Sequence, residues 1–356
     1  MRCSTPRGGA STGRRSPRTP CGPHSAVPDM EATDLDSLVL RTANGWLQAG
    51  GRAWLVTVAR TWGSSPRPPG SLMAMNARGE VVGSVSGGCI EDDLVRRVQR
   101  QATAQAQAEG ATALPDVLRY GISADEAHRF GLPCGGTVEL VMEPLHGRSR
   151  LQELLDGCAQ RRCVERALHL ASGEVLLRDV AHGAAPLLDA ERFVTRFAPV
   201  ARLVVIGAGD TAYYACQMAV NVGFDIVLCD PRLEQAPAWA RGRIAFTRDM
   251  PDDVVLALRD DDRTAVLALS HDPKLDDLAL IEALRSRAFY VGAIGSRNNS
   301  ARRRERLQAH FGLQDSELKR LHGPAGLFIG SRTPAEIALS MVAELVAAKN
   351  GVPAGA

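Results

Sequence analysis

Residues 203–212 read Leu-Val-Val-Ile-Gly-Ala-Gly-Asp-Thr-Ala, a short apolar run that leads into a glycine-rich turn. The run is typical of a buried strand, and Gly207, Gly209 and Ala212 follow it at the spacing G-x-G-x-x-A. Gly207 permits a tight turn, Gly209 lets the backbone approach a pyrophosphate, and Ala212 lets the following helix pack closely. The first N–H groups of that helix would face a phosphate.

A second apolar strand ends at Asp230, 23 residues beyond Gly207. An acid at this distance commonly binds a ribose hydroxyl of a dinucleotide. Arg232 follows closely, and it is either a contact for a 2′-phosphate or a solvated loop charge. The order strand, turn, helix, strand and acid predicts a Rossmann-type fold, although the fold alone does not establish a bound nucleotide.

The rest of the second half alternates between apolar strands and amphipathic segments, which predicts a doubly wound parallel sheet covered by helices. Thr333 and Glu336 form a capping box, with Pro334 at the first helical position, and they predict the start of the last helix. The strand candidates are Leu203–Ile206, Ile226–Cys229, Ala265–Leu269, Phe289–Ala293 and Leu327–Ile329.

Two further loops follow predicted strands, at the carboxyl ends where this fold binds ligands. His271 and Asp272 lie in one of them, either as a proton-transfer pair and candidate catalytic residues or as an anion contact. Alternatively, Asp272 caps a turn before Pro273 while His271 faces solvent. The other loop contributes Gly295 and Ser296 as candidate cofactor contacts.

The length of 356 residues predicts about two domains. We place an N-terminal α+β domain at 30–180, a linker rich in Ala, Pro and Arg at 181–199, and the Rossmann-type domain at 200–350. Residues 1–29 hold five arginines, one acidic residue and hardly any large apolar side chain. Such a segment cannot bury enough surface to fold, so we expect a disordered tail or an extension before a true start at Met30.

Two cysteines of the first half stand beside glycines. Cys89 opens a predicted helix, where the positive end of the helix dipole favours a thiolate, although Glu91 would oppose one. Cys134 has a similar Pro-Cys-Gly-Gly setting. They are either ligand contacts or small buried residues. The candidate cofactor-binding residues of this half are Ser86, Gly87, Gly88, Cys89, Cys134, Gly135 and Gly136.

The composition narrows the classes of function. The net charge is +2 and aromatic residues make up 4%, so nothing indicates nucleic acid or a membrane surface as a partner. No run approaches the ~18 apolar residues of a membrane span. Eight irregularly spaced cysteines indicate reduced thiols in a cytoplasmic protein.

Six segments between about Thr33 and the last helix carry a family resemblance through their order and spacing: Thr61–Gly70, Gly83–Glu91, Cys134–Gly136, the glycine turn at 207–212, Val291–Arg297 and Gly323–Ala338. Through these segments the chain resembles the XdhC/CoxI family of xanthine dehydrogenase accessory proteins. The resemblance implies a chaperone that binds the molybdenum cofactor (molybdopterin), protects it during sulfuration and inserts it into an apo molybdenum hydroxylase. It further implies a cysteine desulfurase as a second partner, and a homodimer.

A thiolate is a plausible soft ligand of molybdenum, so we hypothesise that Cys89 and Cys134 face the cofactor and contact its metal. On this interpretation the chain is a maturation chaperone without turnover of its own. Two alternatives stay open. One is an NAD(P)-dependent oxidoreductase that uses His271 as its acid or base. The other is a sulfur-transfer protein that carries a persulfide on Cys89 or Cys134.

Overall fold

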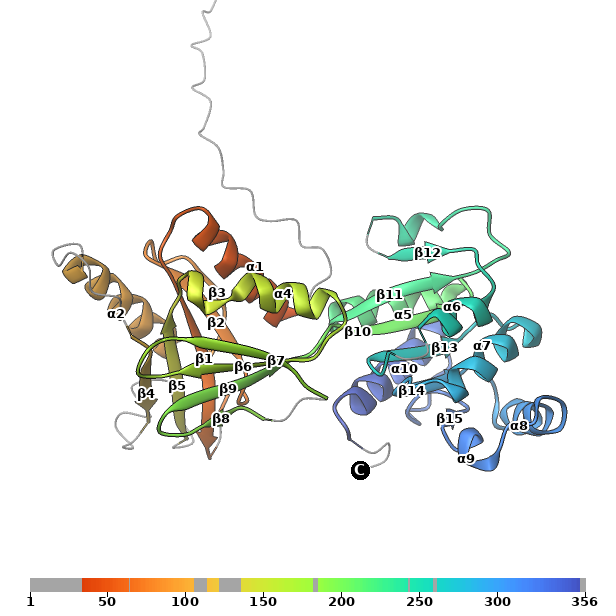
Figure 1. The fold of residues 1–356 in the computed structure, drawn as a ribbon. Coiled ribbons are helices and arrows are strands. Elements are labelled where there is room, and N and C mark those ends of the chain that lie inside the picture. Colours follow the sequence, from red (N-terminus) through yellow and green to blue (C-terminus); the bar gives the residue numbers. More distant parts are fainter. Residues whose placement is uncertain are drawn as a thin grey trace, which may run out of the picture. The chain divides into compact units, whose positions relative to one another are not determined.

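A computed structural model describes residues 34–352, except for 64, 106–113, 122–135, 182–184, 243 and 259–260. Residues 1–29, Cys134 and Gly135 lie outside the described residues, as does the side chain of Cys89. The described chain forms three β-sheets and the helices that pack against them (Figure 1). Two of the sheets belong to the first half of the chain and one to the second half.

The second half contains a six-stranded, fully parallel sheet in the order β12-β11-β10-β13-β14-β15. This order reverses direction between β10 and β13, which confirms the predicted doubly wound Rossmann-type fold. Its strands are β10 (Ala201–Ile206), β11 (Phe224–Cys229), β12 (Ala245–Thr247), β13 (Thr264–Ala268), β14 (Tyr290–Ala293) and β15 (Leu321–His322). Its helices are α5 (Asp210–Asn221), α6 (Pro251–Ala257), α7 (Pro273–Arg285), α8 (Arg297–Phe311), α9 (Asp315–Leu318) and α10 (Pro334–Lys349), with a 3-10 turn at Ala238–Ala240.

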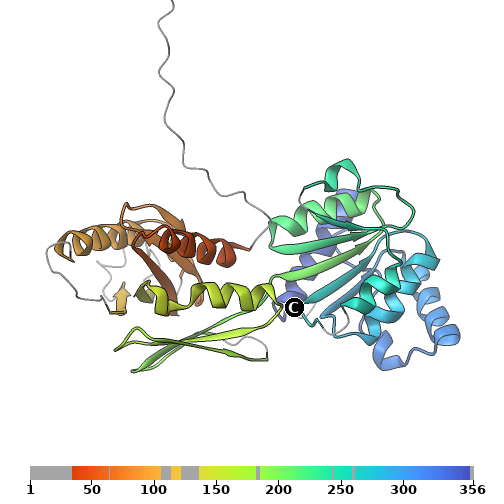
Figure 2. The same cartoon turned by 45° about the horizontal axis from the view of Figure 1, so that its top comes forward.

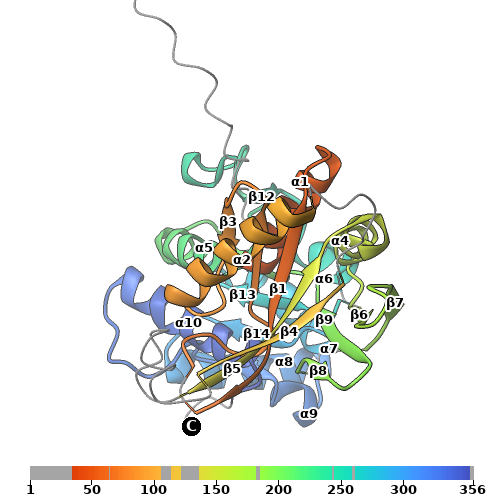
Figure 3. The same ribbon diagram turned by 90° about the vertical axis from the view of Figure 1, so that its left-hand side faces the viewer.

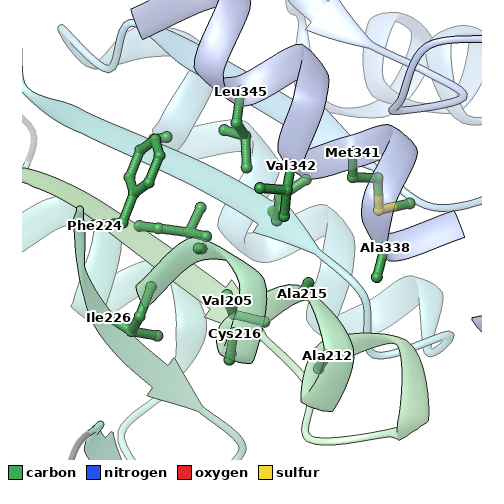
Figure 4. Close-up of a cluster of buried hydrophobic side chains, with 14 of the residues drawn as sticks. Val205, Ala212, Ala215, Cys216, Phe224, Ile226, Ala338, Met341, Val342 and Leu345 are labelled. Atoms are coloured by element: carbon green, nitrogen blue, oxygen red, sulfur yellow. The ribbon is translucent and has the colours of Figure 1, made fainter. Parts of the chain in front are cut away.

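Helices cover both faces of this sheet (Figure 2). Leu203 and Val205 point into a core with α5 and α10, while Val204 and Ile206 point into a core with α6, α7 and α8. From Leu203 to Ile206 the strand is therefore apolar at every position, as expected of a parallel strand buried on both faces. Figure 4 shows the first of these cores, in which the fully buried Ala212 lies.

The first half begins with a five-stranded antiparallel sheet in the order β3-β2-β1-β5-β4. Helix α2 packs on one face of this sheet, while α1 and α4 pack on the other (Figure 3). The sheet therefore confirms the α+β class predicted for this half. Its elements are α1 (Leu35–Gln48), β1 (Ala53–Trp62), β2 (Leu72–Asn76), β3 (Val81–Gly83), α2 (Cys89–Gln105), β4 (Asp116–Tyr120), β5 (Thr137–Pro144), a 3-10 turn at Gly147–Ser149 and α4 (Leu151–Ala159).

The predicted linker at 181–199 is wrong, because this stretch contributes two strands to a third sheet. That four-stranded antiparallel sheet has the order β7-β6-β9-β8. Its strands are β6 (Val164–His169), β7 (Val175–Asp179), β8 (Leu187–Leu188) and β9 (Arg192–Phe197). In β9, Phe193 and Thr195 are buried while Arg192 is exposed. This alternation is typical of a strand with one buried face, although the composition of the stretch resembles that of a linker.

The strand predicted at Leu327–Ile329 is also wrong. The sixth strand is the two-residue β15, and Leu327–Ile329 forms an irregular loop before α10. Phe328 is 91% exposed in that loop, so the apolar run does not fill a core. The capping box that follows is confirmed, because Thr333 accepts the Glu336 N–H and Glu336 accepts the Thr333 N–H.

The glycine turn has a backbone requirement that can be tested. Gly207 has φ of +93°, and a Cβ at this position would lie 2.4 Å from the Ser270 Cα. Gly209 has φ of −77° and open space around it. We predict that Gly207→Ala lowers the free energy of unfolding by more than about 2 kcal/mol, while Gly209→Ala costs less than about 1 kcal/mol. Urea denaturation of both variants measures the difference, and equal losses would contradict it.

Candidate functional site

The turn after β10 lies at the edge of the parallel sheet where the strands end. The Gly207 N–H donates to the Cys229 carbonyl at 2.8 Å, which ties the turn to β11. Gly209 is the N-cap of α5 and has no side chain within 4 Å of a Cβ built there. The first N–H groups of α5 have no acceptor within the helix and no side-chain cap from Gly209, as in sites that bind phosphate.

Asp230 follows β11 at this edge, but its carboxylate already has partners. One oxygen accepts the Ala208 N–H at 3.0 Å and an Arg232 Nη at 2.9 Å; the other accepts the N–H and the Nε of Arg232. Burial alone would raise the pKa of Asp230, but these hydrogen bonds outweigh it and hold the pKa below its usual value. A ribose hydroxyl would have to displace Arg232 to reach this acid.

Arg232 is held across the same edge. Besides its two side-chain hydrogen bonds to Asp230, Arg232 donates to the Ser270 carbonyl at 3.4 Å. Its side chain is 46% exposed. The hydrogen bonds and charge of Asp230 raise the pKa of Arg232, so the guanidinium stays charged. The group that this edge presents to a ligand is therefore an anchored cation rather than a free carboxylate.

A buried polar network joins the loops that follow β13 and β14. Asp276 is fully buried. It accepts two hydrogen bonds from Ser270, one from the N–H at 3.1 Å and one from the hydroxyl at 2.6 Å. Arg303 donates to Asp276 at 3.2 Å and to the Ile294 carbonyl at 3.0 Å. Sequence reasoning missed this network, because its members lie far apart in the chain and none belongs to a motif. It fixes the two loops beside the glycine turn.

The other residues predicted for this edge have local roles. Asp272 is the N-cap of α7 and accepts the Lys274 N–H at 2.9 Å, as the structural alternative expected. His271 is exposed and has a left-handed backbone with φ of 59°. Ser296 is the N-cap of α8 and accepts the Asn299 N–H at 3.2 Å, directly after Gly295. Catalytic or cofactor roles for these residues stay predictions.

The glycine loop of the first half is closed by one carboxylate. The four consecutive N–H groups of residues 85–88 all donate to Glu91, at distances from 2.7 to 3.0 Å. The Ser84 hydroxyl donates to it at 2.9 Å, and the Ser86 hydroxyl makes a further short contact. Glu91 therefore satisfies six donors that precede α2.

This arrangement changes what the loop can offer a ligand. Burial alone would raise the pKa of Glu91, but the Ser86 hydroxyl and the loop amides lower it to about 2. Because Glu91 is charged at neutral pH and accepts hydrogen bonds from the amides around Gly87 and Gly88, these amides are not free for a phosphate. The loop instead has a fixed shape that ends at Cys89, where α2 begins. Gly136, before β5, is buried.

Within the described ranges, no group of three or more His, Cys, Asp or Glu residues could hold a metal ion. Four cysteines of this part are free thiols: Cys158, Cys163, Cys216 and Cys229. Burial raises the pKa of each of them, so none of the four has a thiolate-favouring environment. Over the same ranges, no helix combines the length and apolar character that crossing a bilayer requires.

The parallel sheet, the glycine turn and the helix that follows it define a protein with a C-terminal Rossmann domain. Comparison with protein families refines this class. The family described as the XdhC Rossmann domain matches residues 203–345, and the XdhC and CoxI family matches residues 46–121. The chain belongs to the XdhC and CoxI family.

Individual relatives extend over most of the chain. The molybdenum cofactor insertion chaperone PaoD of Escherichia coli is 26% identical over 89% of this chain and 90% of its own length. A probable xanthine dehydrogenase subunit of Bacillus subtilis is 24% identical over 84% of this chain and 94% of its own length. The crystal structure of a xanthine dehydrogenase from Bacillus halodurans superposes with a TM-score of 0.70 at 26% identity, over 89% of this chain and 96% of that one.

The Glu91 contacts predict that the wild-type protein and a Glu91→Gln variant differ in stability, and that this difference depends on pH. We expect Glu91→Gln to lower the free energy of unfolding by roughly 1–3 kcal/mol near neutral pH, because several loop donors lose their charged acceptor. A carboxylate with a depressed pKa stabilises the folded state above its unfolded pKa of about 4.5, and this stabilisation is lost as the pH falls toward about 2. The gap between wild type and variant should therefore shrink over that range.

Chemical denaturation across this pH range measures the gap. Asp92→Asn is the matched control, because Asp92 is an exposed acid in the same first turn of α2. A gap for Glu91→Gln that is no larger than that of the control would contradict the role of the carboxylate.

Proposed function

We propose that this chain is a maturation chaperone that binds the molybdenum cofactor, protects it during sulfuration and inserts it into an apo molybdenum hydroxylase of the xanthine dehydrogenase type. The chaperone has no turnover of its own on this proposal. It works in the cytoplasm as a homodimer, with a cysteine desulfurase as the source of sulfur. The observation that carries the proposal is the similarity to a cofactor insertion chaperone along nine-tenths of both chains.

The first half would hold the metal end of this cargo. Glu91 gives the loop before α2 a fixed shape, so Cys89 starts the helix at a defined place. We propose that Cys89, together with Cys134, contacts the molybdenum, because a thiolate is a soft ligand. Ser86, Gly87 and Gly88 then act by positioning Cys89, and their amides do not bind the phosphate of the pterin.

The Rossmann domain would bind a phosphate. The N–H groups at the start of α5 have no side-chain cap from Gly209, and Arg232 supplies an anchored positive charge at the same edge. Both features suit the phosphate of a molybdopterin or that of a nucleotide. A second candidate function is nucleotide binding. It would favour NADP over NAD, because Arg232 can meet a 2′-phosphate whereas both oxygens of Asp230 already accept hydrogen bonds.

The chaperone function predicts that cargo copurifies with the protein. We expect the full chain, isolated from a molybdenum-replete host, to contain molybdenum and pterin. The double variant Cys89→Ala/Cys134→Ala should retain about tenfold less, whereas Cys163→Ala, which alters a thiol outside both glycine loops, should retain as much as wild type. Metal analysis and pterin fluorescence measure both components. Equal retention by the double variant would remove the two cysteines from the cargo site.

The nucleotide candidate has a separate test. Titration calorimetry should show NADP binding more tightly than NAD, and Arg232→Gln should reduce that preference by roughly 1–2 kcal/mol. Glutamine keeps a donor for the buried Asp230, and Arg241→Gln is the control because Arg241 is exposed in a loop after β11. Absence of heat with either nucleotide at millimolar concentration would exclude this candidate.

A further inference from the structure

Helices α5 and α10 lie side by side on one face of the parallel sheet (Figure 4). They run in the same direction, and at their ends Lys349 of α10 donates to the carbonyl of Val222, the C-cap of α5, at 3.2 Å. Their outer sides are open to solvent, and Leu339 of α10 is 52% exposed. We define the helix face by the outward residues of this pair: Tyr213, Tyr214, Gln217 and Asn221 of α5, and Leu339, Ala343 and Ala347 of α10.

The helix face has no charged side chain between its two ends. Helix α5 contains no Lys, Arg or Glu, and its one acid, Asp210, is its first residue. In α10, Glu336 is in the first turn, Lys349 is the last residue, and Glu344 is buried. By contrast, α8 on the opposite face of the sheet holds five arginines. A surface that lacks charge and carries tyrosines is typical of the centre of a protein interface.

The loop before α10 extends the helix face with a fixed apolar arm, which we define as Phe328 and Ile329. The Gly326 N–H donates to the buried Glu344 at 2.6 Å, and the loop ends at Thr333, the N-cap of α10. Between these two anchors, Phe328 is 91% exposed and Ile329 is 52% exposed. Large apolar side chains that a fixed backbone holds in solvent mark a contact surface.

The two ends of the helix face carry charges of both signs. The charged residues at the end where the helices begin are Asp210, Glu336, Arg297 and Arg332. Those at the other end are Lys349, Arg263 and Asp34. Neither end has the single sign that would select an acidic or a basic partner. The uncharged middle also lets the same surface meet itself without repulsion, as a two-fold contact requires.

A two-fold contact in which α10 runs antiparallel to its copy would match the two ends. It places the start of each helix beside the end of the other copy's helix, so that the helix dipoles attract. It also brings the arm of one copy toward the end where Val222 and Val352 are 42% and 49% exposed. Ala343 lies in the middle of the α10 row, where a small side chain lets two helices approach closely.

The size of the surface is sufficient for such a contact. At 1.5 Å per residue, α10 is about 24 Å long and α5 is about 18 Å long. With helices ~10 Å apart, their outer side spans roughly 400 Å², to which the arm adds two exposed side chains. On two copies this amounts to about 1,000 Å², which is the size that a specific interface requires.

We infer that the helix face and the apolar arm form the interface between two copies of this chain, in a two-fold contact with antiparallel α10 helices. The inference rests on the proposed function for the existence of a homodimer, and it assigns the surface that forms it. The interface contains neither Arg232 nor the loop that Glu91 closes, so assembly and cargo retention can be measured separately.

Sedimentation velocity of the full chain over a range of concentrations tests the surface. We expect the wild type to be a dimer. Leu339→Asp and Phe328→Asp should each raise the dissociation constant of the dimer at least about tenfold, because each places a carboxylate in the apolar contact. Phe328→Asp alters a side chain that touches little of its own fold, so it should fold normally. Leu256→Asp is the matched control, since Leu256 is 43% exposed on α6 at the opposite face of the sheet.

A cysteine variant tests the two-fold geometry. A residue near a two-fold axis lies beside its own copy, so mild oxidation should link two Ala343→Cys chains through a disulfide. The linked fraction should exceed the background that the native cysteines give in the wild type, whereas Leu256→Cys should stay at that background.

The outcomes separate the interface from the function on which it rests. A monomeric wild type overturns the inference, as do dimers that both Asp variants retain. Asp variants that stay dimeric but no longer bind the purified apo-hydroxylase assign the surface to that partner and also overturn it. Monomeric Asp variants without an Ala343→Cys cross-link overturn the two-fold arrangement. A wild-type dimer that Leu339→Asp dissociates supports the interface even if it contains no molybdenum or pterin, a result that would instead overturn the proposed function.

Discussion

The second half of the molecule depends on the close approach of two backbone segments. The Gly207 turn and Ser270 lie so near each other that no side chain fits between them. This contact lets β10 and β13 run side by side to their ends at the point where the strand order reverses. Ser270 in turn binds Asp276, whose partner Arg303 reaches the loop after β14. The edge of the sheet is therefore a connected unit whose loops have one defined arrangement.

Buried or half-buried carboxylates organise the loops of both halves. Asp230 joins the glycine turn to Arg232, Asp276 joins two strand ends, and Glu91 gathers the amides of the loop before α2. In each case a side chain accepts N–H groups that a loop would otherwise leave unpaired, which is costly when water is excluded. Asp230, the acid that the sequence pattern assigns to a ribose hydroxyl, thus serves the backbone and Arg232 first. The groups left at these loops to meet a ligand are Arg232 and the start of α5 at the Rossmann edge, and the start of α2 at Cys89.

Sequence patterns predicted much of this architecture because its strongest signals are local. Residues 203–212 indicate a strand, a turn and a helix at once, and Thr333 with Glu336 marks the last helix. The errors came from segments whose structure depends on distant partners. Strand β9 exists because β6 lies beside it, and Leu327–Ile329 stays outside the sheet although it is apolar. The role of Glu91 required the loop amides to be placed in space, and the meeting of Asp276 with Arg303 required the fold.

The loop closed by Glu91 has a consequence for the kinetics of capture. A glycine-rich segment without internal partners would sample many conformations, and a ligand would have to select or impose one of them. Here Glu91 already holds the loop in one conformation. Binding of a cargo molecule would therefore require little further loss of conformational entropy at this loop. The encounter rate should then be governed by diffusion and by access to Cys89. Release would then not be driven by the loop returning to disorder, and on the proposed function it would come from competition by the recipient.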